Sequence, residues 1–414
     1  MAPKGRHTLV YRHSAREYLL SFVVAFFFFF FIFFINQILL IAQKILIKQV
    51  DYTSVLILVL LSVPQFLLYT FPFASLTASS MVIGDLGANN ELLALRSSGI
   101  SLFRVFIPII AISLLVSAMT FFTADVLVPY SARQYRALYT ELMRDLPTLE
   151  IRANATNTIG SRSITNRAVD GSTIYDLVML EQEGSRSGQV MTAPSADVSL
   201  ADLASFIYRL DVEQPTILKS EQGSGWTLSR ADRATLLLNF SGQVASLASA
   251  LPSQLSIGEL KVLIAENKAI LSEEQARHER KIADVREQID ALGDSASDQR
   301  LTALTASLDD LLANRPINFY YQYYRAELSK KYALSAACTL LVLLTFSLSF
   351  FRLKHGRLIG FGLSMLASVL YWYILFFSQM QIFETKIAVE LWIWLANIIM
   401  TIFGLFGLLA TRRL

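Results

Sequence analysis

Six long apolar stretches constrain this chain more than any other feature, because each can cross a membrane as a helix. A helix needs roughly 20 mainly apolar residues to span a hydrocarbon core of about 30 Å. The stretches lie near residues 18–42, 54–83, 102–128, 332–351, 358–380 and 388–410. The first is too long for the apolar core of a signal peptide, and no small-residue cleavage site follows promptly, so we expect it to stay as an anchor. The pattern predicts a helical membrane protein with six transmembrane helices.

A polar region separates the first three stretches from the last three. From about residue 148 to 240 it consists of short pieces with alternating apolar and polar residues, such as STIYDLVMLEQ and GWTLSRADRATLLLNF, divided by Gly, Asp, Asn and Pro. This alternation is typical of antiparallel strands, so an all-β sandwich is predicted. We expect residues 1–128 to hold three membrane helices, residues 129–318 to form an inserted domain, and residues 319–414 to hold three more helices.

The inserted domain is expected to carry a helical hairpin at residues 273–314. Two series of apolar residues recur there at spacings of three and four, on either side of Gly293. The first comprises Ile282, Val285, Ile289 and Leu292, and the second comprises Leu301, Leu304, Leu308 and Leu311. Two apolar seams about a turn predict two helices that pack against each other. Pro316 ends the pattern before an aromatic run from Phe319 to Tyr324, which is typical of a membrane surface.

The charges of the short loops predict the orientation. Lys and Arg precede the first stretch, flank the second loop, fill the fourth loop and end the chain, whereas the opposite short loops offer only Lys44, Lys48 and Lys386. Cytoplasmic loops of membrane proteins carry the excess of Lys and Arg. We therefore expect both chain ends and the loop with Glu91 to be cytoplasmic, and residues 129–318 to be extracytoplasmic.

The chain shows no motif for chemistry of its own. It lacks a GxxxxGK[ST] phosphate loop, an HExxH motif, paired Cys/His metal spacings and a GxSxG elbow, so no enzyme activity, metal or cofactor is expected. The formal net charge of +3 does not favour nucleic-acid binding. The single cysteine, Cys338, cannot form an intramolecular disulfide. Asp125, near the end of the third stretch, has no obvious partner for a proton relay.

The loop between the second and third membrane stretches predicts a short amphipathic helix at residues 89–99. The segment Gly84-Asp85-Leu86-Gly87 is expected to end the membrane helix, and Asn89 or Asn90 to precede the new helix. The candidate functional residues are Glu91 in the first turn, Leu92, Leu95 and Arg96 at helical spacing, and Gly99 at the end. Two interpretations are open: an element that docks a soluble partner, and an ordinary capped loop between spans.

Four stretches resemble one known family. NNELLALRSSGIS and FPFASLTAS around this loop, RHSAREYL before the first span, and GRLIGFGLSMLASVLYWYILFFSQ in the fifth are similar to the LptF/LptG (YjgP/YjgQ) family of lipopolysaccharide export ABC-transporter permeases. The resemblance covers both membrane halves and is weak between about residues 150 and 315. Ser329 departs from the histidine that often precedes the basic pair, and Ser335 and Ser349 stand where prolines are common.

The resemblance implies a function, a location and a set of partners. A member would be a multi-pass permease of the bacterial inner membrane that extracts lipopolysaccharide and passes it to a periplasmic bridge toward the outer membrane. ATP hydrolysis would belong to a separate LptB-type ATPase dimer, which the helix at residues 89–99 would contact. A second LptF/LptG-type permease would complete the pair, and LptC/LptA-type periplasmic proteins would receive the lipid. The inserted domain would be a periplasmic β-jellyroll whose edge strand continues a neighbour's sheet.

The lipid would need an apolar cavity with cations near its outer rim. Lys44 and Lys48 are four residues apart near the outer end of the first span, so they lie on one face of a helix. Two interpretations of this pair are open: the lysines bind lipid phosphates, or they extend to the membrane surface only to keep their charge in water.

Two other functional classes remain to be compared with export. An envelope scaffold would tether partners through the sheet and the hairpin without transport. An ion-coupled secondary transporter would need intramembrane carboxylates and repeated halves, and the sequence shows neither.

Overall fold

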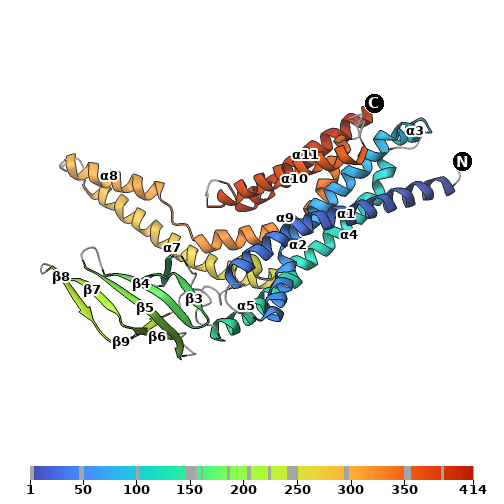
Figure 1. The fold of residues 1–414 in the computed structure, drawn as a ribbon. Coiled ribbons are helices and arrows are strands. Elements are labelled where there is room, and N and C mark those ends of the chain that lie inside the picture. Colours follow the sequence, from blue (N-terminus) through green and yellow to red (C-terminus); the bar gives the residue numbers. More distant parts are fainter. Residues whose placement is uncertain are drawn as a thin grey trace. The chain divides into compact units, whose positions relative to one another are not determined.

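The computed structural model describes residues 4–45, 51–98, 102–145, 154, 156–159, 162–183, 187–202, 207–221, 225–239, 250–292, 298–348, 356–383 and 387–413 (Figure 1). These residues fall into two compact units. One comprises Met1–Phe29, Leu67–Val126 and Leu255–Leu414, and the other comprises Phe30–Phe66 and Leu127–Gln254. The sites discussed below each lie within one unit.

Among the described residues, six helices are long and apolar enough to cross a membrane, which confirms the prediction of six membrane helices. They are α1 (Lys4–Ile45), α2 (Tyr52–Ala88), α4 (Leu102–Phe122) with its continuation, α9 (Phe319–Leu348), α10 (Gly356–Met380) and α11 (Val389–Arg413). The third does not stop at residue 128: α4 passes through a π-helix, η1 (Thr123–Leu127), into α5 (Val128–Asp145). The fourth begins at Phe319, so the aromatic run forms its first turns.

The prediction that Gly84-Asp85-Leu86-Gly87 ends the second membrane helix is wrong. Helix α2 continues through this segment to Ala88. Gly84 instead allows a close helix crossing, because a Cβ there would lie 2.8 Å from the carbonyl oxygen of Gly356. On the same face of α2, Ser80 Oγ donates a hydrogen bond to the Gly360 carbonyl at 2.6 Å. The small residues therefore let the backbones of α2 and α10 approach, as in many membrane helix pairs.

The region between the third and fourth membrane helices contains an antiparallel β-sheet, as the alternation predicted. In the described residues nine strands form one sheet with the order β1-β2-β4-β5-β6-β9, while β3 pairs with β4, and β7 pairs with β5 and β8. The strands are β1 (Thr156–Ile159), β2 (Arg162–Thr165), β3 (Ala168–Asp170), β4 (Thr173–Glu183), β5 (Ser187–Asp202), β6 (Ile207–Glu213), β7 (Thr216–Glu221), β8 (Gly225–Arg230) and β9 (Arg233–Asn239).

The long strand β5 changes its partner part-way along. Its residues Gln189 to Thr192 pair with β7, and its residues Ser195 to Asp202 pair with β6. On its other edge, β4 pairs with the section from Ser187 to Asp197. Pro194 lies between the two sections, where a residue without an N–H group costs no ladder bond to either of these partners. The inward-facing residues of β2, β4, β5 and β6 form one buried core.

Two details of the sheet differ from the sequence pattern. The segment GWTLSRADRATLLLNF, read as one alternating piece, forms the two strands β8 and β9, and the alternation did not single out β1, β3 or β7. A hydrogen bond from Gln214 N to Asp232 O, 2.9 Å long, joins the turn before β7 to the turn between β8 and β9. The start of the predicted β region, residues 148–153, lies outside the described residues.

The helical insert is present as two packed helices, α7 (Ile257–Leu292) and α8 (Asp298–Ala313) (Figure 1). Helix α7 begins at Ile257 rather than near Glu273, because the apolar segment after Pro252 continues into the hairpin without a break. His278 Nε2 lies 2.8 Å from the carbonyl oxygen of Leu311. The seam residues Ile282, Val285, Ile289, Leu304, Leu308 and Leu311 are half-buried, and Leu301 is exposed.

Candidate functional site

The predicted short helix exists as α3 (Glu91–Ser97), between α2 and α4. Asn90 adopts a left-handed conformation with a φ of 56°, which asparagine tolerates better than most residues. Its N–H group bonds to the carbonyl of Gly87 at 3.2 Å, and its carbonyl accepts the N–H of Ala94 at 3.0 Å. Two residues, Asn89 and Asn90, therefore separate the end of α2 from the start of α3. Glu91 occupies that first turn, where the helix dipole favours a negative charge.

The apolar face of α3 turns toward the protein's own membrane helices. Leu92 is only 8% exposed and belongs to a buried cluster with residues of α1, α2 and α4, including Tyr18 and Phe106. Leu95 packs against the same cluster. This differs from the expectation that both leucines face a partner. Hydropathy spacing identifies an apolar face, but it does not say whether the same chain already covers it.

The outward face of α3 is different from the predicted one. Leu93 is 64% exposed, and Ala94 and Ser97 are exposed beside it. A large exposed leucine on a seven-residue helix was missed in the sequence because it does not follow the i, i+3 spacing of Leu92 and Leu95. The side chain of Arg96 and the residue Gly99 lie outside what the structure describes.

Charged residues from three membrane helices surround the base of α3. Glu91 Oε2 lies 3.7 Å from Nε2 of His13 in α1. Arg357, in the first turn of α10, pairs with Glu17 of α1 and with Asp85 of α2, the latter at 3.0 Å between Nη2 and Oδ2. His13 and Glu17 are one helical turn apart, so both point from one side of α1. We call Arg357, Glu17 and Asp85 the ion cluster. It joins segments far apart in the sequence.

Buried hydrogen bonds between polar side chains and neighbouring helices fix the membrane helices behind this cluster. The Tyr18 hydroxyl and Ser75 Oγ are 2.7 Å apart, and Ser75 donates to the carbonyl of Cys338 at 2.7 Å. Ser79 and Thr345 hydroxyls are 2.8 Å apart. In hydrocarbon an unsatisfied hydroxyl costs free energy, so these bonds favour one arrangement of α1, α2 and α9.

A second polar junction lies around the π-helix η1. Asp125 Oδ1 accepts a 2.7 Å hydrogen bond from the N–H of Ile257, the first residue of α7. Lys331 of α9 is 3% exposed and donates to the carbonyl of Ala124. No partner of Asp125 could be predicted from the sequence, because its acceptor role depends on a helix start that is distant in the chain. A carboxylate at the start of a helix stabilises it, so Asp125 acts as an anchor for α7.

The structure describes little of Lys44 and Lys48, the two lysines predicted to bind lipid phosphates. Lys44 lies in the last turn of α1, and its side chain is not described. Lys48 lies outside the described residues. Phosphate binding by this pair stays a prediction.

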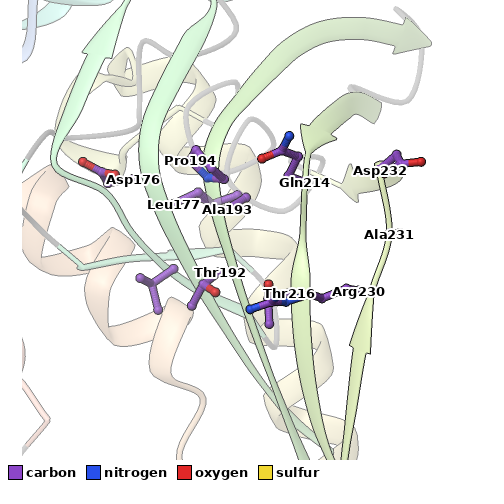
Figure 2. Close-up of a pocket in the computed structure, with 11 residues that line it drawn as sticks. Asp176, Leu177, Thr192, Ala193, Pro194, Gln214, Thr216, Arg230, Ala231 and Asp232 are labelled. Atoms are coloured by element: carbon purple, nitrogen blue, oxygen red, sulfur yellow. The ribbon is translucent and has the colours of Figure 1, made fainter.

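A hollow of about 800 Å³ lies in the β region (Figure 2). It is lined by residues of β4, β5, β7 and β8 and of the turns beside them, as Figure 2 shows. Its charged residues are Asp176, Arg230 and Asp232. Asp176 pairs with Arg167. In the part of the chain that the structure describes, no group of three or more His, Cys, Asp and Glu residues is arranged to hold a metal ion.

Comparison with known proteins gives one family. Residues 12–410 match the family described as lipopolysaccharide export system permease LptF/LptG, which is nearly the whole chain. No curated protein matches.

Proposed function

Because the chain belongs to the LptF/LptG family of lipopolysaccharide export permeases, we propose that it is a transmembrane subunit of an ABC transporter. In this proposal it extracts lipopolysaccharide from the bacterial inner membrane and passes it to a periplasmic bridge. Six membrane helices with an inserted antiparallel β region suit a subunit that binds and moves a lipid. ATP hydrolysis belongs to an LptB-type ATPase dimer, and a second LptF/LptG-type permease completes the pair.

The observation that carries the proposal is the outward face of α3. A seven-residue helix is too short to be stable alone, so the contacts of Leu92 and Leu95 with the membrane helices hold it in place. They leave Leu93 exposed at the loop end of two spans, and an exposed apolar side chain on a fixed helix is a suitable anchor for a partner's groove. We propose that Leu93 meets the ATPase, with Glu91 at the edge of the contact.

The test is co-purification of the ATPase with full-length variants. Replacing Leu93 by Asp places a charge in the proposed contact, which costs several kcal/mol if the site is desolvated. Leu93→Met is the matched control, because it keeps an apolar side chain of similar volume. We expect Leu93→Asp to insert in the membrane and lose the ATPase, and Leu93→Met to retain it. Normal ATPase stoichiometry with Leu93→Asp contradicts the proposal, and no ATPase on the unchanged protein favours the scaffold alternative.

The β region supplies the proposed contact with LptC/LptA-type proteins. All six residues of β8 are exposed, and among the described strands β8 pairs only with β7. Trp226 and Leu228 on this strand are both more than half exposed. An open strand with exposed apolar side chains is suited to strand addition, in which a partner continues the sheet. A photocrosslinker at position 226 is expected to link the protein to the periplasmic partner. Crosslinks from other faces of the sheet, with none from position 226, would contradict this edge as the contact.

A further inference from the structure

A second hollow, of about 230 Å³, lies where α9 begins, α10 ends and α11 begins. Glu327 and Lys330 of α9 line it together with the aromatic residues Phe319, Tyr323 and Phe383, and Gln379 lies at the end of α10. The rings of Phe319 and Phe383 are stacked with centroids 4.6 Å apart. We call this site the α9–α11 hollow. It is separate from α3 and from the ion cluster.

An almost fully buried ion pair forms part of the wall. Lys330 Nζ lies 2.6 Å from Glu327 Oε1, and their side chains are 13% and 7% exposed. Ionisable residues inside membrane segments are costly, and they commonly mark a functional site. This pair uses one of three ammonium hydrogens and one of two carboxylate oxygens, so each group can bind a further ligand atom. The hollow therefore presents one positive and one negative group side by side.

The ends of the three helices place the hollow at a membrane surface. Chain turns join successive spans outside the hydrocarbon, and α10 ends at Met380 shortly before α11 begins at Val389. The first turns of α9 carry Phe319, Tyr320 and Tyr324, and aromatic residues are enriched at this level of a bilayer. Phe377 and Met380, at the end of α10, are exposed apolar residues that offer a surface for acyl chains. Lipid head groups occupy the same depth.

Size and charge then select the ligand. The volume is below the roughly 300–1,000 Å³ of pockets that enclose drug-sized molecules, so the hollow suits a head group rather than a whole lipid. We propose that the α9–α11 hollow binds the head group of a zwitterionic phospholipid of the phosphatidylethanolamine type. The phosphate pairs with Lys330, and the ammonium pairs with Glu327 and lies against the ring of Tyr323. This resident lipid site does not depend on the transport function or on the ATPase.

The first experiment compares lipids on the purified, delipidated full-length protein in detergent, by the shift of its thermal unfolding midpoint. Short-chain phosphatidylethanolamine is expected to raise the midpoint in a concentration-dependent way, because a ligand of the folded state stabilises it. Short-chain phosphatidylglycerol, which has the phosphate but no ammonium, should give a smaller shift. Inorganic phosphate should give none, and free phosphoethanolamine, which has the head group without the acyl chains, should give a smaller shift than the lipid. An equal shift with phosphatidylglycerol, or an equal shift with inorganic phosphate, overturns the proposal.

The second experiment assigns the shift to the hollow. The double variant Glu327→Gln with Lys330→Gln removes both charges and leaves neither unpaired, and it should weaken phosphatidylethanolamine binding by about tenfold or more. Gln379→Trp fills the hollow without changing any charge, so it remains informative if the double variant does not fold. The control is Arg325→Gln with Glu390→Gln, which removes another ion pair of α9 and α11 that does not line the hollow. Unchanged binding in either test variant, or an equal loss in the control, overturns the site.

Discussion

Ion pairs lie near both ends of helix α10, in opposite surroundings. At its start, Arg357 is 46% exposed and pairs with two carboxylates on α1 and α2. Beside its end, Glu327 and Lys330 form a pair that is almost fully buried, with Lys331 buried next to it. Exposed ion pairs contribute little and break easily, whereas a buried pair costs much free energy when one partner is removed. The first arrangement suits helices that shift when a partner binds, and the second suits a fixed junction or ligand site.

The largest effect is expected from breaking the buried pair. Glu327→Gln leaves the Lys330 ammonium without its carboxylate, which should lower the free energy of unfolding by about 3–5 kcal/mol. The measurement is chemical unfolding in detergent. The double variant that also carries Lys330→Gln should recover most of the loss, because the Lys330 ammonium is then no longer buried without its carboxylate. A single variant as stable as the unchanged protein would show that water reaches this pair and would remove the contrast between the two ends.

A smaller effect is expected from the glycine crossing beside the ion cluster. In Gly84→Ala the new Cβ meets the Gly356 backbone, so α2 and α10 must separate, at a cost of about 1–3 kcal/mol. Gly362→Ala is the matched control, because a Cβ there meets nothing within 4 Å. The same unfolding measurement applies. An equal stability of both variants would mean that α2 and α10 do not cross closely at this point.

The ion cluster itself should matter little for stability and more for coupling. Arg357→Gln removes two partly exposed ion pairs, each worth about 0.2–1 kcal/mol, and the loss should shrink as salt is added because charges that water reaches are screened. The Glu327→Gln loss should hardly depend on salt. If α3 docks the ATPase, Arg357→Gln should keep the ATPase bound but alter lipid-stimulated ATP hydrolysis. If Arg357→Gln lowered the free energy of unfolding by several kcal/mol regardless of salt, the ion cluster would be closed to water. The ion pairs near the two ends of α10 would then behave alike.

Local patterns predicted the elements well because hydropathy and alternation are properties of neighbouring residues. The six apolar stretches and most of the strands follow from them. Strands β1 and β3 were missed because they are too short to show an alternation, and β7 because it directly follows Pro215. The end of α2 was misplaced because Gly84 looks the same in sequence whether it ends a helix or contacts another one. Only the distant residue Gly356 decides between these two roles.

The candidate site was less predictable because it depends on contacts between distant segments. The spacing of Leu92 and Leu95 gave a correct amphipathic helix, but the protein's own spans cover that face and leave Leu93 outward. The pairing of Glu17 with Arg357 joins residues on opposite sides of the β region in the sequence. No local pattern contains that information. The resemblance to a family pointed to the segment between α2 and α4, whereas the exposure of Leu93 follows only from the structure.

The smallest effect is expected from the helical insert, which lies apart from both ends of α10 in the chain. Helix α7 is anchored at its first residue, Ile257, through Asp125, and this anchor precedes the hairpin. The seam residues of α7 and α8 are only half-buried, so the two helices mainly stabilise each other. Deleting about residues 279–307 and inserting a short Gly-Ser bridge should therefore change the unfolding free energy of the rest by less than about 1 kcal/mol and leave ATPase binding intact. The matched control is Asp125→Asn, which keeps the hairpin but weakens the anchor, and it should be the more destabilising of the two. A deletion protein that does not fold would show that the hairpin is part of the core. The junction around Asp125 and Lys331 would then not be enough to stabilise the rest of the protein without it.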